Sequence, residues 1–286
     1  MVDSLLPADA LKGVRLAISV SESADLPRLG LLDSHLRMAL GEVTRCVIVS
    51  GGSLTYGGNL DPSGYAPFLV HELSRYSRRD RPLRLCLAWS EHRKLTLSRI
   101  QQQRTELGLF GELVCLAIDG TPVDAAAGRQ EVPPTPADND TVQRSLTGLR
   151  RYMSTESRGR VLMGGRREGY AGVIPGLLEE ALIALDHGQP LYLAGGFGGI
   201  TADIARRLNV DGGHWLPSIE QVQWTDATQA AFQKLEQIHR AAEWTGPNNG
   251  LSTEENRRLA RTHRASEVAA FVSLGLGRRF AATAPP

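Results

Sequence analysis

The segment RVLMGGRREGYAGVIPGLLEEALIALDHGQPLYLAGGFGGITADIARRL, residues 160–208, decides the fold class. Its apolar runs 160–163 and 190–194 are short and continuous, as in strands that are covered on both faces of a parallel sheet. Between them, residues 174–187 repeat leucine and alanine at helical spacing, and Gly188 supplies a stop. A strand, a glycine-rich turn and a helix thus occur twice in succession, which indicates βα units.

The same alternation runs through the rest of the chain. The other expected strands are residues 14–20, 45–50, 83–89 and 112–118, and the other expected helices are 30–42, 65–79, 94–107 and 139–157. Together they predict an α/β fold with a doubly wound, mostly parallel, Rossmann-like sheet. The stretch 119–139 is rich in proline and lacks apolar periodicity, so we expect an exposed loop there.

Strand signals stop after residue 208, and segments 225–243 and 252–275 have helical character. A helical tail of this length makes little core of its own, so we expect it to pack on the preceding domain. The predicted organisation is one domain at residues 1–209 and a C-terminal helical extension at residues 210–286.

The charge balance excludes several classes of protein. Thirty-two Lys and Arg residues against 31 Asp and Glu leave a formal net charge of +1, which gives no reason to expect nucleic acid as a partner. No apolar run approaches the ~18 residues of a membrane span, so no membrane partner is expected. The three cysteines lie in apolar runs, and no secretory leader is visible. We therefore expect a cytoplasmic, globular protein.

Neither a metal site nor a cofactor is expected. The seven histidines are scattered without the spacing of metal ligands. The sequence contains no GxSxG elbow and no GxxxxGK[ST] motif, which disfavours a nucleophilic hydrolase and a Walker-type NTPase. Three tryptophans of the extension are candidate interface anchors, so we expect a homo-oligomer: Trp215, Trp224 and Trp244.

Four glycine-rich junctions follow expected strands, where α/β proteins usually bind ligands. They are residues 20–30, 50–65, 163–176 and 194–208. Backbone N–H groups at a strand–glycine–helix junction favour an anion such as phosphate, although glycine pairs also serve simple tight turns. The repeated Gly-Gly pairs, together with Arg166 and Arg167, favour a nucleotide or sugar-phosphate site.

These junctions resemble the SLOG superfamily in sequence. The similar segments are ISVSESADLPRLGLLDSHLRMAL (18–40), SGGSLTYGGNLDPSGY (50–65) and residues 161–199. The superfamily unites Rossmann-like domains similar to the lonely-guy phosphoribohydrolases, the nucleotide-sensing domains of TRPM channels and the sensor domain of Thoeris anti-phage effectors. The chain looks most similar to its prokaryotic conflict-system clusters. The resemblance implies that residues 1–209 bind a nucleotide-derived ligand.

The resemblance also implies two alternative activities. The phosphoribohydrolase branch has a Pro-Gly-Gly-x-Gly-Thr-x-x-Glu pattern; this chain keeps Gly164 and Gly165 and has Glu179 three residues past Gly176, but it inserts RREGYAGVIP and lacks the Gly-Thr step. We therefore expect a sensor that binds an ADP-ribose-like ligand and signals through its oligomer or to an effector protein in trans. The alternative is an enzyme that cleaves the N-glycosidic bond of a nucleoside monophosphate or an NAD-like dinucleotide, with Glu179 as catalytic acid/base.

The residues expected to bind the ligand lie on all four junctions. They are Ser21, Glu22, Arg28, Gly51, Gly52, Tyr56, Gly57, Gly164, Gly165, Arg166, Arg167, Gly176, Glu179, Gly195, Gly196 and Phe197. Some have an ordinary structural role as the alternative. Glu179 also suits a helix start as a stabilising acid, Tyr56 also suits loop packing, and the two arginines also suit a solvated loop.

Overall fold

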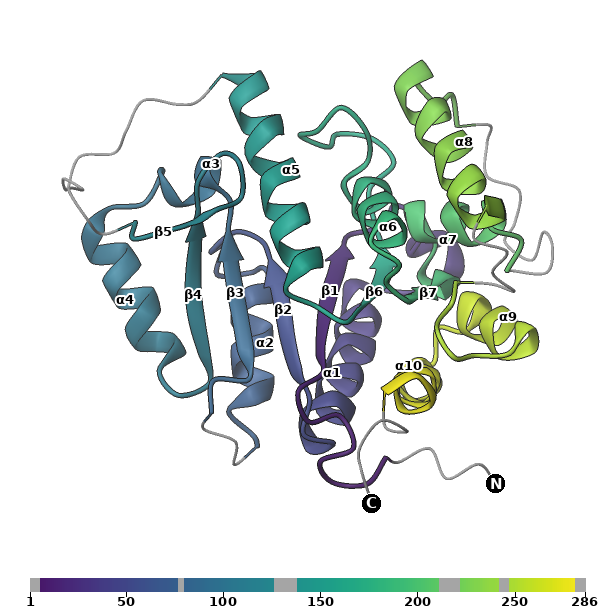
Figure 1. Cartoon of the computed structure of the whole chain (residues 1–286), viewed down its shortest axis with the longest axis horizontal. Helices are drawn as coiled ribbons and strands as arrows, with labels where there is room; N and C mark the ends of the chain where they lie inside the picture. The colour runs from purple at the N-terminus through teal and green to yellow at the C-terminus, as the bar shows by residue number, and fades with distance from the viewer. Residues whose placement is uncertain (1–5, 77–79, 126–137, 211–221, 242–246, 281–286) are drawn as a thin grey trace.

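The computed structural model describes residues 6–76, 80–125, 138–210, 222–241 and 247–280. In these residues seven strands form one sheet in the order β5-β4-β3-β2-β1-β6-β7. Every neighbouring pair is parallel except β4 with β5. The chain therefore has the α/β, doubly wound and mostly parallel architecture that its sequence predicts (Figure 1).

The elements have the following bounds. The strands are β1 (Arg15–Ser21), β2 (Ser53–Gly57), β3 (Leu83–Leu87), β4 (Gly111–Leu116), β5 (Pro122–Val123), β6 (Gly159–Gly164) and β7 (Leu191–Ala194). The helices are α1 (Asp33–Val49), α2 (Tyr65–Leu73), α3 (Trp89–His92), α4 (Leu97–Leu107), α5 (Asn139–Thr155), α6 (Gly176–Asp186), α7 (Gly199–Arg207), α8 (Asp226–Ala241), α9 (Thr253–Arg261) and α10 (Ala265–Phe280), with 3-10 turns η1 (Pro27–Leu29) and η2 (Gly195–Phe197).

Alternate residues of each strand point to opposite faces of the sheet, so the core has a layer on each face. Leu16 and Ile18 of β1 pack with the apolar sides of α1, α2 and α10 on one face. Ala17 packs with α5 on the opposite face, where α6, α7 and α8 form a further cluster with β6 and β7. Figure 1 shows α5 and α6 in front of the sheet and α1 and α2 behind it. Both faces are covered, which explains why the strands are continuously apolar.

One predicted strand is wrong. Residues 45–49 form the end of helix α1 and Ser50 caps it; the buried helix residues Leu36, Leu40, Val43 and Val47 recur at helical spacing. A short apolar run has no period that separates a buried strand from a buried helical turn. The strand that follows is β2, inside the stretch 50–65 that the sequence presented as a glycine-rich junction.

The other predicted elements are present with shifted ends. The predicted helix 252–275 is two helices, α9 and α10, since the chain turns between Arg261 and Ala265. The predicted loop 119–139 contains the short antiparallel strand β5. Residues 126–137 of that loop, together with Trp215 and Trp244, lie outside the described residues.

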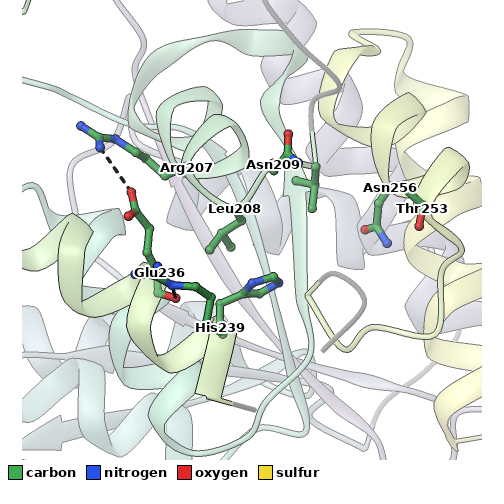
Figure 2. Close-up of a pocket in the computed structure, with 9 residues that line it drawn as sticks. Arg207, Leu208, Asn209, Glu236, His239, Thr253 and Asn256 are labelled. Carbon is green, nitrogen blue, oxygen red and sulfur yellow. Dashed lines mark hydrogen bonds and ion pairs between the residues drawn. The ribbon is translucent and has the colours of Figure 1, made fainter. Parts of the chain in front are cut away.

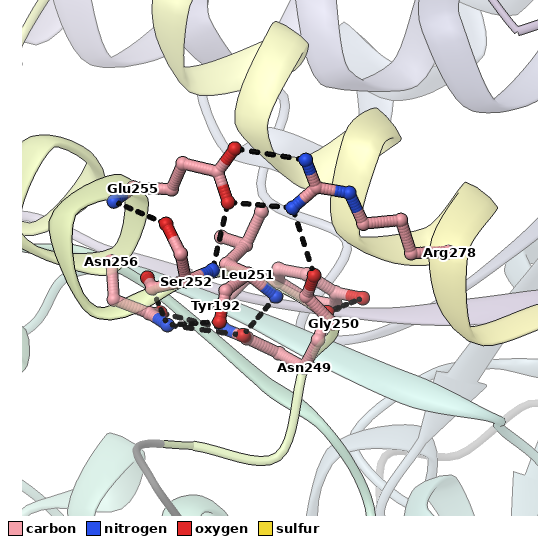
Figure 3. Close-up of polar contacts among 8 residues, drawn as sticks. All are labelled: Tyr192, Asn249, Gly250, Leu251, Ser252, Glu255, Asn256 and Arg278. Carbon is pink, nitrogen blue, oxygen red and sulfur yellow. Dashed lines mark hydrogen bonds and ion pairs between the residues drawn. The ribbon is translucent and has the colours of Figure 1, made fainter.

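The C-terminal extension is fastened to the edge strand β7 (Figure 3). Asn249 Nδ2 donates to the Leu191 carbonyl at 2.6 Å, which caps a backbone group of the sheet edge. Ser252 and Glu255 form a capping box at the start of α9. The Arg278 guanidinium of α10 then pairs with Glu255 at 2.6 Å. These contacts hold the extension against the sheet.

Among the described residues, no helix combines the length and the apolar character that crossing a membrane requires.

Candidate functional site

The sheet reverses its winding direction between β1 and β6. From β1 the chain proceeds through β2, β3 and β4 to one side, whereas β6 and β7 lie on the other side. In open α/β sheets the carboxyl ends of strands at such a switch point diverge and leave a crevice for ligands. Ser21 ends β1 directly opposite Gly164, which ends β6. The third junction of the sequence and the first therefore meet at this point.

A cleft of about 1250 Å³ opens at these two strand ends. Its walls are residues 22–28 and 31–33, which follow β1, residues 165–168, which follow β6, and residues 222–223. Five of the predicted ligand-binding residues line it: Glu22, Arg28, Gly165, Arg166 and Arg167. We take this cleft as the candidate functional site.

Two glycines bring the walls together at the base of the cleft. Gly164 and Gly165 have φ angles of 67° and 101°, which residues with a side chain rarely adopt. Gly165 N donates to the Ser21 carbonyl at 3.0 Å, and a Cβ on Gly165 would collide with Ile200 of α7. This close packing requires the glycine pair whether or not a ligand is bound.

A buried ion pair joins the two walls at the base. Arg167 is 9% exposed, and it donates through Nη1 to Asp25 and through Nε to Asp203, both at 2.6 Å. Burial raises the pKa of Asp203 above its ordinary value, an effect that Arg167 counteracts. The sequence predicted that Arg167 binds a ligand; in the structure its donors already have protein acceptors.

Asp25 also occupies the position of an anion at the start of α7. Its Oδ2 accepts a hydrogen bond from Gly199 N at 2.7 Å, and Gly198 has a φ of 71°, which brings the backbone against the carboxylate. A helix N-terminus favours negative charge, and here the protein supplies that charge itself. Arg28 lies 3.3 Å from the other carboxylate oxygen of Asp25.

A second ion pair spans the cleft at its solvent-exposed side. Arg166 Nη2 donates to Glu22 Oε2 at 2.7 Å. The two side chains are 55% and 67% exposed, in contrast to the buried pair of Arg167 with Asp25. The cleft thus has a base held by a buried ion pair and a mouth that an exposed ion pair crosses.

Glu179, the predicted catalytic residue, lies on the helix α6 outside this cleft. Its carboxylate accepts hydrogen bonds from Thr147 Oγ1 at 2.5 Å and from Arg150 of α5. It lines a separate cavity of about 360 Å³ between α5, α6 and α8, which shares no lining residue with the cleft. Gly176 also faces Arg150, since a Cβ there would lie 2.8 Å from Arg150 Nη2.

The predicted residues of the second junction do not reach the cleft. Gly51 and Gly52 precede β2, at the amino ends of the strands, where Gly51 packs on Asp9 and Gly52 on Val47. Tyr56 is 7% exposed in the core, and burial raises the pKa of its hydroxyl. A Cβ on Gly57 would collide with Met153 of α5. The strand error at residues 45–50 explains the position of Gly51 and Gly52, whereas Tyr56 and Gly57 lie at the carboxyl end of β2 and are packed in the core.

The predicted residues of the fourth junction support the C-terminal extension. A Cβ on Gly195 would lie 2.6 Å from the Ala260 carbonyl, and one on Gly196 would collide with the Thr262 carbonyl. These glycines let the end of α9 approach η2 closely. Phe197 is fully buried.

A further cavity of about 400 Å³ lies beside the end of α7, between α8 and α9 (Figure 2). Arg207 pairs there with Glu236 at 3.2 Å, and His239 and Asn256 are among its other lining residues. None of the residues predicted from the sequence lines it. In the described residues no group of three or more His, Cys, Asp or Glu side chains is arranged to hold a metal ion.

The sequence did not select Asp25 and Asp203 as site residues. Asp25 is one of several polar residues in the first junction, and Asp203 lies within the fourth junction, five residues after the Gly-Gly-x-Gly run at residues 195–198. Nothing in their spacing shows that one arginine joins them, because the three residues come from three separate loops and helices.

Comparison with known protein families gives a match over most of the chain. The family model described as SLOG cluster2 matches residues 10–259, which include every strand and helices α1 to α8. The search of curated proteins returned no match.

Proposed function

Since the chain belongs to the SLOG family, we propose that it is a sensor and that it binds a nucleotide-derived ligand in the cleft between β1 and β6. Family membership itself connects the chain with nucleotide-related binding or processing. The observation that carries the proposal is the position of the cleft at the switch point of the sheet, where α/β proteins bind nucleotides. Its volume of about 1250 Å³ is ample for an ADP-ribose-like molecule, since small-molecule pockets occupy roughly 300–1,000 Å³.

The charges of the cleft suit a ligand that carries both phosphate and hydroxyl groups. The Arg166 guanidinium reaches solvent at the mouth and is able to form charge-assisted hydrogen bonds with a phosphate. The carboxylates that line the cleft accept hydrogen bonds, which ribose hydroxyls donate. A ligand with a phosphate at the mouth and a ribose deeper in the cleft satisfies both.

The environment of Glu179 supports binding rather than cleavage. An acid/base must come within hydrogen-bond distance of the reacting group. Glu179 lines the other cavity, and its two carboxylate oxygens accept from Thr147 and Arg150. We therefore propose that occupancy of the cleft is the signal, passed to an effector protein in trans or through an oligomer, in a prokaryotic conflict or anti-phage system.

Calorimetric titration of the purified chain with ADP-ribose, NAD, AMP and adenosine tests this function. We expect binding of at least one phosphorylated compound and a raised melting temperature in its presence, because the ligand binds only the folded state. Arg166→Gln should lower the affinity for AMP more than the affinity for adenosine. Arg144→Gln, a change of an exposed arginine on α5 outside the cleft, should alter neither.

Chromatography of the same mixtures separates the two activities. Unchanged ligand after prolonged incubation supports a sensor, whereas released base or ribose phosphate would establish the N-glycosidase alternative. If no compound binds, the cleft is not a nucleotide site.

A further inference from the structure

We propose that Glu22 is a specificity-determining residue that competes with the ligand for Arg166, so that the cleft selects ligands whose anionic group displaces a carboxylate. This inference rests on the proposed function of the cleft. It follows from how the three arginines that line the cleft are paired: Arg28, Arg166 and Arg167.

Two of these arginines are tied to the same buried carboxylate. Arg167 and Arg28 both pair with Asp25, whose side chain is 5% exposed and which also accepts from Gly199 N. Arg167 is the closer and more buried partner, and removing it from a buried carboxylate is costly. Arg167 is therefore part of the base, whereas Arg28 comes from the same wall as Asp25 and pairs with it at 3.3 Å.

Arg166 is paired differently. Its partner Glu22 comes from the opposite wall, and both side chains are more than half exposed. An exposed ion pair contributes only ~0.2–1 kcal/mol, so an incoming anion replaces it at small cost. Arg166 is thus the most exposed of the three cations, at 55% against 38% for Arg28 and 9% for Arg167, and Glu22 occupies the position of the ligand's anionic group until the ligand binds.

The consequence is discrimination by charge. A phosphate monoester such as that of AMP carries about −1.5 to −2 charges at neutral pH and three acceptor oxygens, so it outcompetes the single charge of a carboxylate. An uncharged nucleoside has no group to exchange for Glu22 and gains nothing from Arg166. The pair also joins the two walls, so its opening accompanies binding of an anion and not binding of a nucleoside.

Titration of Glu22→Gln with AMP and with adenosine tests the inference. The glutamine keeps the size of the side chain and removes the competing charge. We expect AMP to bind about two- to fivefold more tightly than to the wild type, which is the range that loss of an exposed ion pair supports, and adenosine to bind equally to both.

Glu168→Gln is the matched control. Glu168 lines the same cleft, and in the part of the chain that the structure describes it has no ion-pair partner. This variant removes one negative charge from the cleft without releasing Arg166, so a smaller gain in AMP affinity is expected. Equal gains in the two variants would show a general effect of charge and overturn the specific role of Glu22.

A double-mutant cycle isolates the pair. In an Arg166→Gln background, Glu22→Gln should tighten AMP binding no more than Glu168→Gln does, because the cation for which Glu22 and AMP compete is absent. If AMP binds the wild type and Glu22→Gln with equal affinity, Glu22 has no such role while the proposed function stands. If the wild type binds none of ADP-ribose, NAD, AMP and adenosine, the proposed function falls and this inference with it.

Discussion

The substitution Glu179→Gln should reduce stability and leave ligand binding unchanged. The residue lies in the helix that follows the third glycine-rich junction, so sequence resemblance gave it a catalytic role. Its side chain is 17% exposed and pairs with Arg150, which is 10% exposed. Because this pair is largely buried between α5 and α6 and lies outside the cleft, the substitution weakens the contact between the two helices and leaves the proposed ligand site unchanged.

The size of the effect follows from the partners that remain. In the variant, the amide oxygen of the introduced glutamine still accepts the hydrogen bond from Thr147 Oγ1. The NH₂ group of the amide then faces the Arg150 guanidinium, and because both groups are donors, the hydrogen bond from Arg150 is lost. Arg150 keeps the carboxylate of Glu180 at 3.8 Å and is not left without a counter-charge. The loss is therefore that of one hydrogen bond between charged groups, about 1.5–3 kcal/mol, and not the ~3–5 kcal/mol of an orphaned buried charge.

Urea denaturation measures this difference, and calorimetric titration with ADP-ribose, NAD and AMP measures binding. Glu254→Gln is the control: Glu254 pairs with Arg257 one helical turn away and is 65% exposed, so its loss should be at most about 0.5 kcal/mol. Unchanged stability together with a fall in ligand affinity, or a loss of turnover, would refute this reasoning and place Glu179 in the functional site.

Two further predictions concern the C-terminal extension. Arg278 and other donors lower the pKa of Glu255 from its ordinary 4.5 to about 2. The ionised carboxylate therefore stabilises the fold fully at pH values above 4.5, and this contribution is lost as the pH falls towards 2. The free energy of unfolding of Glu255→Gln should be lower than that of the wild type at pH 6, and the two should converge near pH 2. Gly196→Ala should lower the free energy of unfolding by about 1–3 kcal/mol, because the new Cβ collides with the Thr262 carbonyl. The affinity for AMP should stay the same. Loss of binding without loss of stability would show that the fourth junction contacts the ligand.

The sequence alone determined the class of fold, because its signals are local. Continuous apolar runs at residues 14–20, 160–163 and 190–194 and the leucine spacing of residues 174–187 reflect burial of each element, and burial on both faces of a strand is typical of a covered parallel sheet. The same local reasoning failed at residues 45–50, where a short apolar run was the end of a helix and the strand came after it.

The sequence also located the strand ends where the candidate cleft lies. Glycines directly after β6 and polar residues directly after β1 identify the edge at which parallel strands finish. Which of the junctions meet depends on strand order, and strand order is set by contacts between distant segments. Only the fold brings Glu22 close to Arg166, which is 144 positions away in the chain, and leaves Gly51 at the opposite, amino ends of the strands.

The roles of the charged residues were decided by tertiary structure. Arg166 and Arg167 are adjacent in sequence and chemically identical, yet one is 55% exposed at the mouth of the cleft and the other is 9% exposed between two carboxylates. Glycine is equally ambiguous: the sequence suggests a phosphate site at the pair 195–196, and in the structure this pair lets the end of α9 approach closely. Sequence records which groups are present, whereas burial and the identity of the nearest partner, which come from packing of segments far apart in the chain, decide whether a charge or a bare backbone is available to a ligand.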